Sequence, residues 1–136
     1  MTIINNPSIE ELKDFFIINQ KNQINFRYFK NRDFNIISNH VKTILLKDND
    51  KILGYGHLDK DESNQIWLGI MVCDDCMGFG YGKIIMAELL INQKDIIKLS
   101  VDIENTIAKK LYENNGFVIT EIKEKFYIME KNNRIL

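Results

Sequence analysis

The chain has 136 residues, of which 45 % are hydrophobic and 27 % are charged, and its formal net charge at pH 7 is −1. This length predicts one domain over residues 1–136 with a core that needs neither disulfides nor a metal ion. The near-zero charge argues against a nucleic-acid or membrane-surface partner, and neither a membrane-spanning apolar run nor a secretion-signal pattern is present.

The N-terminal third begins with a short strand predicted at residues 2–4, followed by a helix. Ser8 and Glu11 have the spacing of a capping box, in which each residue satisfies the other's backbone N–H. The apolar residues that follow recur at helical spacing. They are Ile9, Leu12, Phe15 and Phe16. Residues 21–40 are aromatic and basic, and a second short helix is predicted from Asp33 to His40.

From Val41 the pattern is that of strands. Residues 41–47 and 51–59 form a predicted hairpin, because Asp, Asn and Asp between them favour a turn. Alternation along the second strand places Tyr55, His57 and Asp59 on one face. Residues 65–72 are almost continuously apolar, as expected of a central strand that is covered on both faces.

The C-terminal half predicts helix 80–93, strand 97–103, a helix from about Asn105 and a final hairpin within residues 117–131. Apolar stripes mark the inward faces of the two helices. They consist of Ile85, Met86, Leu89 and Leu90, and of Ile107, Ala108, Leu111 and Tyr112. Gly116 is predicted to end the second helix in a left-handed conformation. The order of elements predicts a mixed α/β fold built on one central sheet.

Three glycines, Gly78, Gly80 and Gly82, lie between the apolar strand and helix 80–93. The first N–H groups of a helix lack internal partners and carry partial positive charge, so a bare backbone there suits a phosphate group. A tight strand-to-helix turn without a ligand is the alternative. The segment is not a Walker loop, because Ile84 follows Gly82-Lys83, and it lacks the third glycine of a dinucleotide fingerprint.

The segment GFGYGKIIMAELL, followed by LSVDIENTIAKKLYENNGFV, resembles the GNAT superfamily of acetyl-CoA-dependent N-acetyltransferases. The family signature, Arg/Gln-x-x-Gly-x-Gly/Ala, falls on Met77, Gly80 and Gly82. Its second motif falls on Asn105, Ala108, Leu111, Tyr112, Gly116 and Phe117. Met77 departs from the signature, since it cannot offer a polar side chain to the pyrophosphate; the backbone donors remain, and weaker binding of the cofactor is expected.

The resemblance implies a mixed, mostly antiparallel twisted sheet that splays between its fourth and fifth strands, with about four flanking helices. It further implies that acetyl-CoA lies in the gap as co-substrate. The implied cofactor-binding residues are Ile70, Met71, Val72, Met77, Gly78, Phe79, Gly80, Tyr81, Gly82, Lys83 and Asn105. Tyr112 would be the general acid that protonates the leaving thiolate, or else an ordinary core tyrosine. Asn105 would contact the pantetheine arm, cap its helix, or do both.

On the acceptor side, the resemblance implies that residues 26–34 shape the pocket. Aromatic rings and guanidinium groups suit a planar, anionic acceptor, although the same segment could simply close the core. The candidate acceptor residues are Arg27, Tyr28, Phe29, Arg32 and Asp59. His57 is the candidate general base for the proton of the acceptor amine, with a structural histidine as the alternative, and Asp59 could accept the same proton.

The predicted activity is transfer of an acetyl group to the primary amine of a small molecule, with an amino sugar, nucleotide-linked or free, as the first hypothesis. Acetylation of a protein or peptide amine and a non-catalytic acyl-CoA-binding module are the alternatives. Cys73 and Cys76 are expected to be reduced and incidental, in keeping with a cytoplasmic location and no metal. Homodimers could form through strand 125–131, taken as an edge strand, by analogy with the family.

Overall fold

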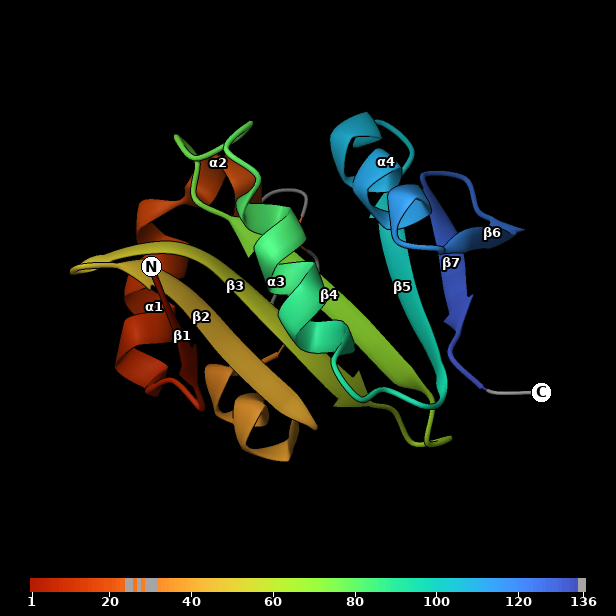
Figure 1. Ribbon diagram of the computed structural model, residues 1–136, viewed down its shortest axis with the longest axis horizontal. Coiled ribbons are helices and arrows are strands. Elements are labelled where there is room, and N and C mark those ends of the chain that lie inside the picture. Colours follow the sequence, from red (N-terminus) through yellow and green to blue (C-terminus); the bar gives the residue numbers. More distant parts are fainter. Residues whose placement is uncertain (24–25, 27, 29–31, 135–136) are drawn as a thin grey trace.

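One mixed sheet organises residues 1–23, 26, 28 and 32–134, which are the residues that the computed structural model describes. Within them the sheet has seven strands in the order β1-β2-β3-β4-β5-β7-β6 (Figure 1). The strands are β1 (Thr2–Asn5), β2 (Lys42–Asp48), β3 (Lys51–Lys60), β4 (Ile66–Val72), β5 (Ile96–Asp102), β6 (Val118–Ile122) and β7 (Phe126–Asn132). The helices are α1 (Ile9–Ile18), α2 (Gln20–Gln23), α3 (Tyr81–Leu90), α4 (Thr106–Asn114) and the 3-10 helix η1 (Phe34–Asn39). This confirms the predicted mixed α/β fold.

Strand β3 presents two different faces to the helices that cover the sheet. Its glycines let α3 approach closely, since a Cβ atom at Gly56 would lie 2.5 Å from Cγ2 of Ile85. On the other face Tyr55 packs edge-on against Phe16 of α1, and the two ring centroids are 5.4 Å apart. The alternation predicted from the sequence therefore decides which side chains meet each layer of helices.

Helix α1 begins at the predicted capping box. The Glu11 backbone N–H donates to Oγ of Ser8 at 3.1 Å, and the Ser8 N–H donates to the Glu11 carboxylate at 3.5 Å. Leu12, Phe15 and Phe16 are then buried, so the cap orients a helix whose apolar face completes the core.

Replacing Ser8 with Ala should lower the free energy of unfolding by about 1 kcal/mol, because the Glu11 N–H loses its acceptor. Urea unfolding followed by far-ultraviolet circular dichroism measures this change. Ser63→Ala is the matched control, since the Ser63 side chain caps no helix; equal midpoints for the two variants would contradict the prediction.

Strands β4 and β5 are parallel and pair at only two positions, Ile66 with Ile97 and Trp67 with Lys98. Strand β5 instead pairs along its whole length with β7, while β4 pairs along its length with β3. The two parallel strands consequently separate toward their C-terminal ends, where α3 and α4 begin (Figure 1). This is the predicted splay, and it leaves one backbone edge of β4 without a neighbouring strand.

Three features differ from the sequence expectations. Strand β7 lies between β5 and β6, so it is not the edge strand that was considered for dimer formation; β6 forms that edge. Ile107 is 67 % exposed, and Tyr112 is the only member of its predicted stripe that is buried. Helix α3 ends at Leu90, three residues early, as Asn92 adopts a left-handed conformation with φ 60°. Among the described residues, no helix combines the length and apolar character needed to cross a bilayer.

Candidate active site

Two cavities occupy the gap between the separated strands. The first, of about 470 Å³, is lined by β4, the loop that follows it, the start of α3 and one face of α4. Every predicted cofactor-binding residue except Phe79 lines it. Among the described residues that line this cavity, the charged side chains are those of Lys83 and Lys110, which are both exposed. None of these described lining residues carries a carboxylate. This cavity is therefore suited to an anionic ligand.

The glycine loop supplies backbone donors to this cavity. Gly78 and Gly80 have φ angles of +87° and +82°, which residues with a Cβ atom rarely adopt. Gly80 is the N-cap of α3, and no side chain caps this helix. Because the first N–H groups of a helix have no intrahelical acceptor, those of α3 remain available to phosphate oxygens.

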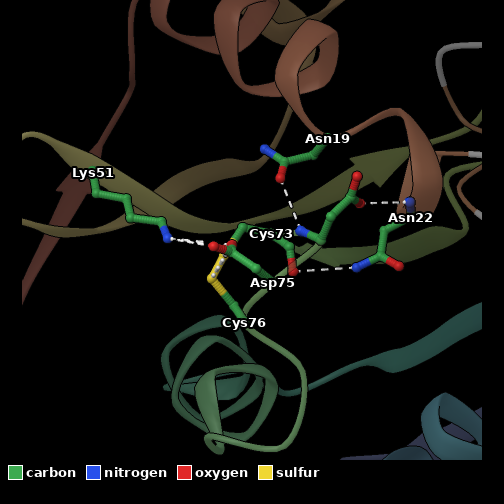
Figure 2. A network of polar contacts seen from close by, with 7 residues as sticks. Asn19, Asn22, Lys51, Cys73, Asp75 and Cys76 are labelled. Atoms are coloured by element: carbon green, nitrogen blue, oxygen red, sulfur yellow. Dashed lines mark hydrogen bonds and ion pairs between the residues drawn. A yellow bond between two sulfur atoms is a disulfide. The ribbon is translucent and has the colours of Figure 1, made fainter.

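The polar clasp, formed by Asn19, Asn22 and Asp74, holds the loop between β4 and α3 in place. Asn22 donates through Nδ2 to the carbonyl of Val72 at 3.0 Å and contacts Sδ of Met77 at 3.5 Å. The same Nδ2 also donates to the carbonyl of Cys73 at 3.3 Å (Figure 2). The Asp74 carboxylate accepts from the Asn22 N–H at 2.7 Å, and its own N–H donates to Oδ1 of Asn19. Asp74 thus ties α2 to the loop.

Cys73 and Cys76 are joined in a disulfide next to this clasp, which corrects the expectation of two free thiols (Figure 2). Both residues are buried, and Asp75 between them forms an ion pair with Lys51 at 3.1 Å. Their sulfur atoms and the Asp75 carboxylate lie close enough together to hold a metal ion in principle. In the disulfide the sulfurs are not thiolates, and Asp75 is already paired with a cation.

The second cavity, of about 440 Å³, lies on the other side of the splay. Three carboxylates line it, from Asp59, Asp61 and Asp102, together with one described guanidinium, that of Arg32. Trp67 forms part of the wall, and its indole N–H donates to Asp61 at 2.9 Å. This excess of negative charge suits a cationic or neutral ligand more than an anionic one.

The two cavities share five lining residues, so they meet in the middle of the splay. These are Phe26, Ile70, Asn105, Ala108 and Tyr112. The Cys73 N–H donates to Leu53 of β3, and bonding alternates along an antiparallel pair, so the Ile70 N–H points away from β3 into the gap. A backbone donor and a phenol therefore lie at the junction of the two cavities.

Tyr112 is nearly completely buried, with 6 % of its surface exposed. Burial raises the pKa of the Tyr112 phenol to about 12, so the hydroxyl keeps its proton at neutral pH. Asn105 caps α4, since its side chain accepts from the Ala108 N–H at 3.2 Å, and it also lines both cavities. Its predicted capping role is confirmed.

His57 is 1 % exposed and packs against Gly69 of the neighbouring strand. Its Nδ1 lies 2.6 Å from the Tyr55 hydroxyl. Burial, with smaller contributions from the charges of His40 and Arg32, holds the pKa of His57 well below 6.5. The imidazole is therefore neutral at pH 7.

This burial makes stability depend on pH. Unfolded His57 takes up a proton as the pH falls below about 6.5, whereas the folded form stays neutral, so the free energy of unfolding should fall by about 1.4 kcal/mol per pH unit there. Urea midpoints between about pH 7 and pH 5.5 measure the slope. His57→Gln should reduce it, because glutamine does not titrate, and half-buried His40, whose pKa is also lowered by burial, should account for a remaining slope of the same sign. An unchanged slope would count against this origin.

The remaining predicted acceptor residues divide into two groups. Tyr28, Arg32 and Asp59 line the second cavity, whereas Arg27 and Phe29 lie outside the described residues. Asn22 and Lys110, which line the first cavity, were missed by the sequence analysis. For Lys110 a signal was present, because it lies three residues after Ile107 and four before Asn114, on one face of α4.

Comparisons with known proteins agree with this geometry. The family model described as an acetyltransferase (GNAT) domain matches residues 39–119. A search of curated proteins finds no match.

Solved structures show the same fold across nearly the whole chain. A proposed acetyltransferase from Salmonella typhimurium, determined with its cofactor acetyl-CoA, is 13 % identical with a TM-score of 0.78, covering 100 % of this chain and 95 % of its own. A spermidine N-acetyltransferase variant from Vibrio cholerae is 18 % identical with a TM-score of 0.73, covering 98 % and 95 %. A ribosomal-protein-alanine N-acetyltransferase from Brucella melitensis is 15 % identical with a TM-score of 0.72, covering 97 % and 99 %. At these identities the likeness concerns the fold.

Proposed function

The chain belongs to the GNAT family of acetyltransferases, and on that basis we propose that it transfers an acetyl group from acetyl-CoA to the primary amine of a small molecule. The observation that carries this proposal is the meeting of the two cavities at Tyr112 and Ile70. One cavity has the cations and free helix N–H groups for a phosphorylated donor. The other has the carboxylates for an amine.

The cofactor half of the proposal uses the first cavity. The N–H groups at the start of α3 would bind the pyrophosphate, and Lys83 and Lys110 would lie near the remaining phosphate charge. Met77 supplies no charge here, so the backbone and these two lysines carry the binding. The pantetheine arm would run along the unpaired edge of β4 and replace the hydrogen bonds of a missing strand.

The acetyl transfer would take place where the two cavities meet, at Ile70 and Tyr112. The neutral amine attacks the thioester carbonyl, a C–N bond forms, and the oxygen becomes an oxyanion that the Ile70 N–H is oriented to stabilise. The C–S bond then breaks, and Tyr112 donates its proton to the sulfur. The nitrogen, positively charged after the attack, releases one proton as the amide forms, and this proton restores the Tyr112 phenol. The thiolate would leave within the same buried space, where burial raises its pKa as it raises that of the phenol. Much of the rate enhancement would come from holding amine and thioester together.

The amino-sugar hypothesis for the acceptor is retained in a narrower form. Tyr28 and Trp67 offer aromatic surface in the second cavity, which suits a sugar ring. The three carboxylates there oppose a phosphate or a nucleotide diphosphate, so the free amino sugar is the better candidate.

The proposal is tested by thiol release from acetyl-CoA in the presence of glucosamine, a nucleotide-linked amino sugar, spermidine or a short peptide with a free α-amino group. Release that depends on glucosamine supports the proposal as stated; release with the peptide alone would move the acceptor to proteins. No release, with acetyl-CoA still raising the melting temperature, would favour a binding module.

A further inference from the structure

A row of short hydrogen bonds leads away from the second cavity. Oδ2 of Asp59, which lines this cavity, accepts from the Tyr28 hydroxyl at 2.7 Å. The same hydroxyl lies 2.7 Å from Nε2 of His40. Nδ1 of His40 lies 2.8 Å from Oγ1 of Thr43 on β2. His40 and Thr43 line neither cavity among the described residues, so this row connects the acceptor side of the splay with a half-buried histidine outside it.

The proposed reaction creates a need for such a row. A primary amine in water at neutral pH is mostly an ammonium ion, and it must lose one proton before it can attack. Transfer to acetyl-CoA then yields an amide, a thiol and one proton in excess. His57 also lines the second cavity, but it is 1 % exposed and its Nδ1 lies 2.6 Å from the buried Tyr55 hydroxyl, so it cannot return the proton directly to water.

We infer that Asp59, Tyr28 and His40 form the path by which the proton of the acceptor ammonium leaves the site; this rests on the proposed function. The ammonium N–H bond breaks and the proton goes to Asp59. Asp59 passes a proton to Oη of Tyr28 while the Tyr28 hydroxyl proton moves to Nε2 of His40. The carboxylate is then ionised again, the phenol is intact, and His40 is an imidazolium that returns the proton to water.

At rest the Tyr28 hydroxyl donates its one proton to Asp59, so this proton is not directed at Nε2 of His40. The path therefore operates after Asp59 is protonated: the Tyr28 oxygen then accepts from Asp59, and its own proton turns toward Nε2. In that step Nε2 must be free to accept while Nδ1 donates to the Thr43 hydroxyl oxygen. A hydroxyl and a neutral imidazole can each donate one hydrogen bond and accept one, so the row can reorganise as the proton passes. Asp59 is the catalytic base here, and Tyr28, His40 and Thr43 act through it.

The charges around His40 favour release of the proton over its retention. Burial is the main cause that lowers the pKa of His40, the Arg32 charge lowers it further, and Asp59 opposes both. The Arg32 guanidinium lies 4.4 Å from the centre of the Tyr28 ring, and the His57 ring lies 4.7 Å from that of His40. The carboxylates of Asp61 and Asp102 line the second cavity together with Asp59.

The test uses Tyr28→Phe and His40→Ala, with Tyr127→Phe as the matched control because Tyr127 lines neither cavity. Turnover is measured with acetyl-CoA and whichever of glucosamine, spermidine or a short peptide stimulates thiol release most. Both variants should lose about tenfold in turnover at pH 7, which is less than the loss of about 10²- to 10⁴-fold typical of a missing acid or base, because Asp59 is still present. Both should bind acetyl-CoA as before. Added imidazole should restore the turnover of His40→Ala, because it can take the place of the missing His40 ring and carry the proton. It should not restore the turnover of Tyr28→Phe, because imidazole does not replace the Tyr28 hydroxyl.

The outcomes separate this inference from the function on which it rests. If the wild-type enzyme is active and both Tyr28→Phe and His40→Ala turn over normally, the proton path is wrong and the acetyltransferase function is retained. Loss of turnover in His40→Ala without rescue by imidazole would assign His40 a structural role and also overturn it. If no amine stimulates the wild-type enzyme, the function and the path fail together. Thr43→Val should weaken turnover, and Thr43→Ser should retain it.

Discussion

Tyr112→Phe should lower turnover about 10²- to 10³-fold and leave the affinity for acetyl-CoA within about twofold, since the change removes only the hydroxyl proton offered to the leaving sulfur. The ring itself stays, so its edge contact with Phe117, at 6.0 Å between centroids, is kept. Steady-state thiol release with the stimulating amine gives turnover, and titration calorimetry gives the affinity. The two readouts separate a chemical role from a packing role.

Tyr127→Phe is the control for this experiment, because it removes a phenol hydroxyl from β7, which lines neither cavity. Its turnover should equal that of the wild-type enzyme. Burial raises the pKa of Tyr112 to about 12, so the rate should show no loss from ionisation of this phenol at pH 9 or below. Wild-type turnover in Tyr112→Phe would remove the tyrosine from the chemistry.

Gly56→Val should lower the free energy of unfolding by about 3 kcal/mol, which is at the upper end for overpacked cores. A Cβ atom at this position would lie 2.5 Å from Ile85 and 2.9 Å from Leu89, and both of these side chains are fully buried in α3. They have no space to retreat into, so α3 must move off the sheet.

Because the free N–H groups at the start of α3 line the first cavity, this shift should also weaken acetyl-CoA binding. Thermal unfolding with and without acetyl-CoA measures both effects, and the melting temperature should fall by about 10 °C. Lys60→Val provides the control, as it places the same side chain at the exposed end of the same strand. A melting temperature equal to that of the control would mean that α3 does not pack as described.

Local patterns in the sequence were sufficient for most of the elements. The Ser8 capping box, the alternation along β3 and the left-handed Gly116 all depend on residues within a few positions of one another, and each was predicted. The glycine loop before α3 and the motif around Tyr112 were sufficient to identify the family from the sequence. Such features depend on short-range sterics and hydrogen bonding, which the order of residues alone determines.

Contacts between distant segments were decided by the tertiary structure. Tyr28, His40 and Asp59 form one row only because the tertiary structure brings Tyr28 and His40, which lie between α2 and β2 in the sequence, to Asp59 on β3. Asp74 bonds to α2 across 52 positions, β7 lies inside the sheet, and Ile107 faces the first cavity. The sequence by itself therefore determined most of the elements, the family and the candidate catalytic tyrosine, but not the short helix α2. Strand order and helix docking decided which polar groups meet at the acceptor side, because these depend on pairings that no local pattern specifies.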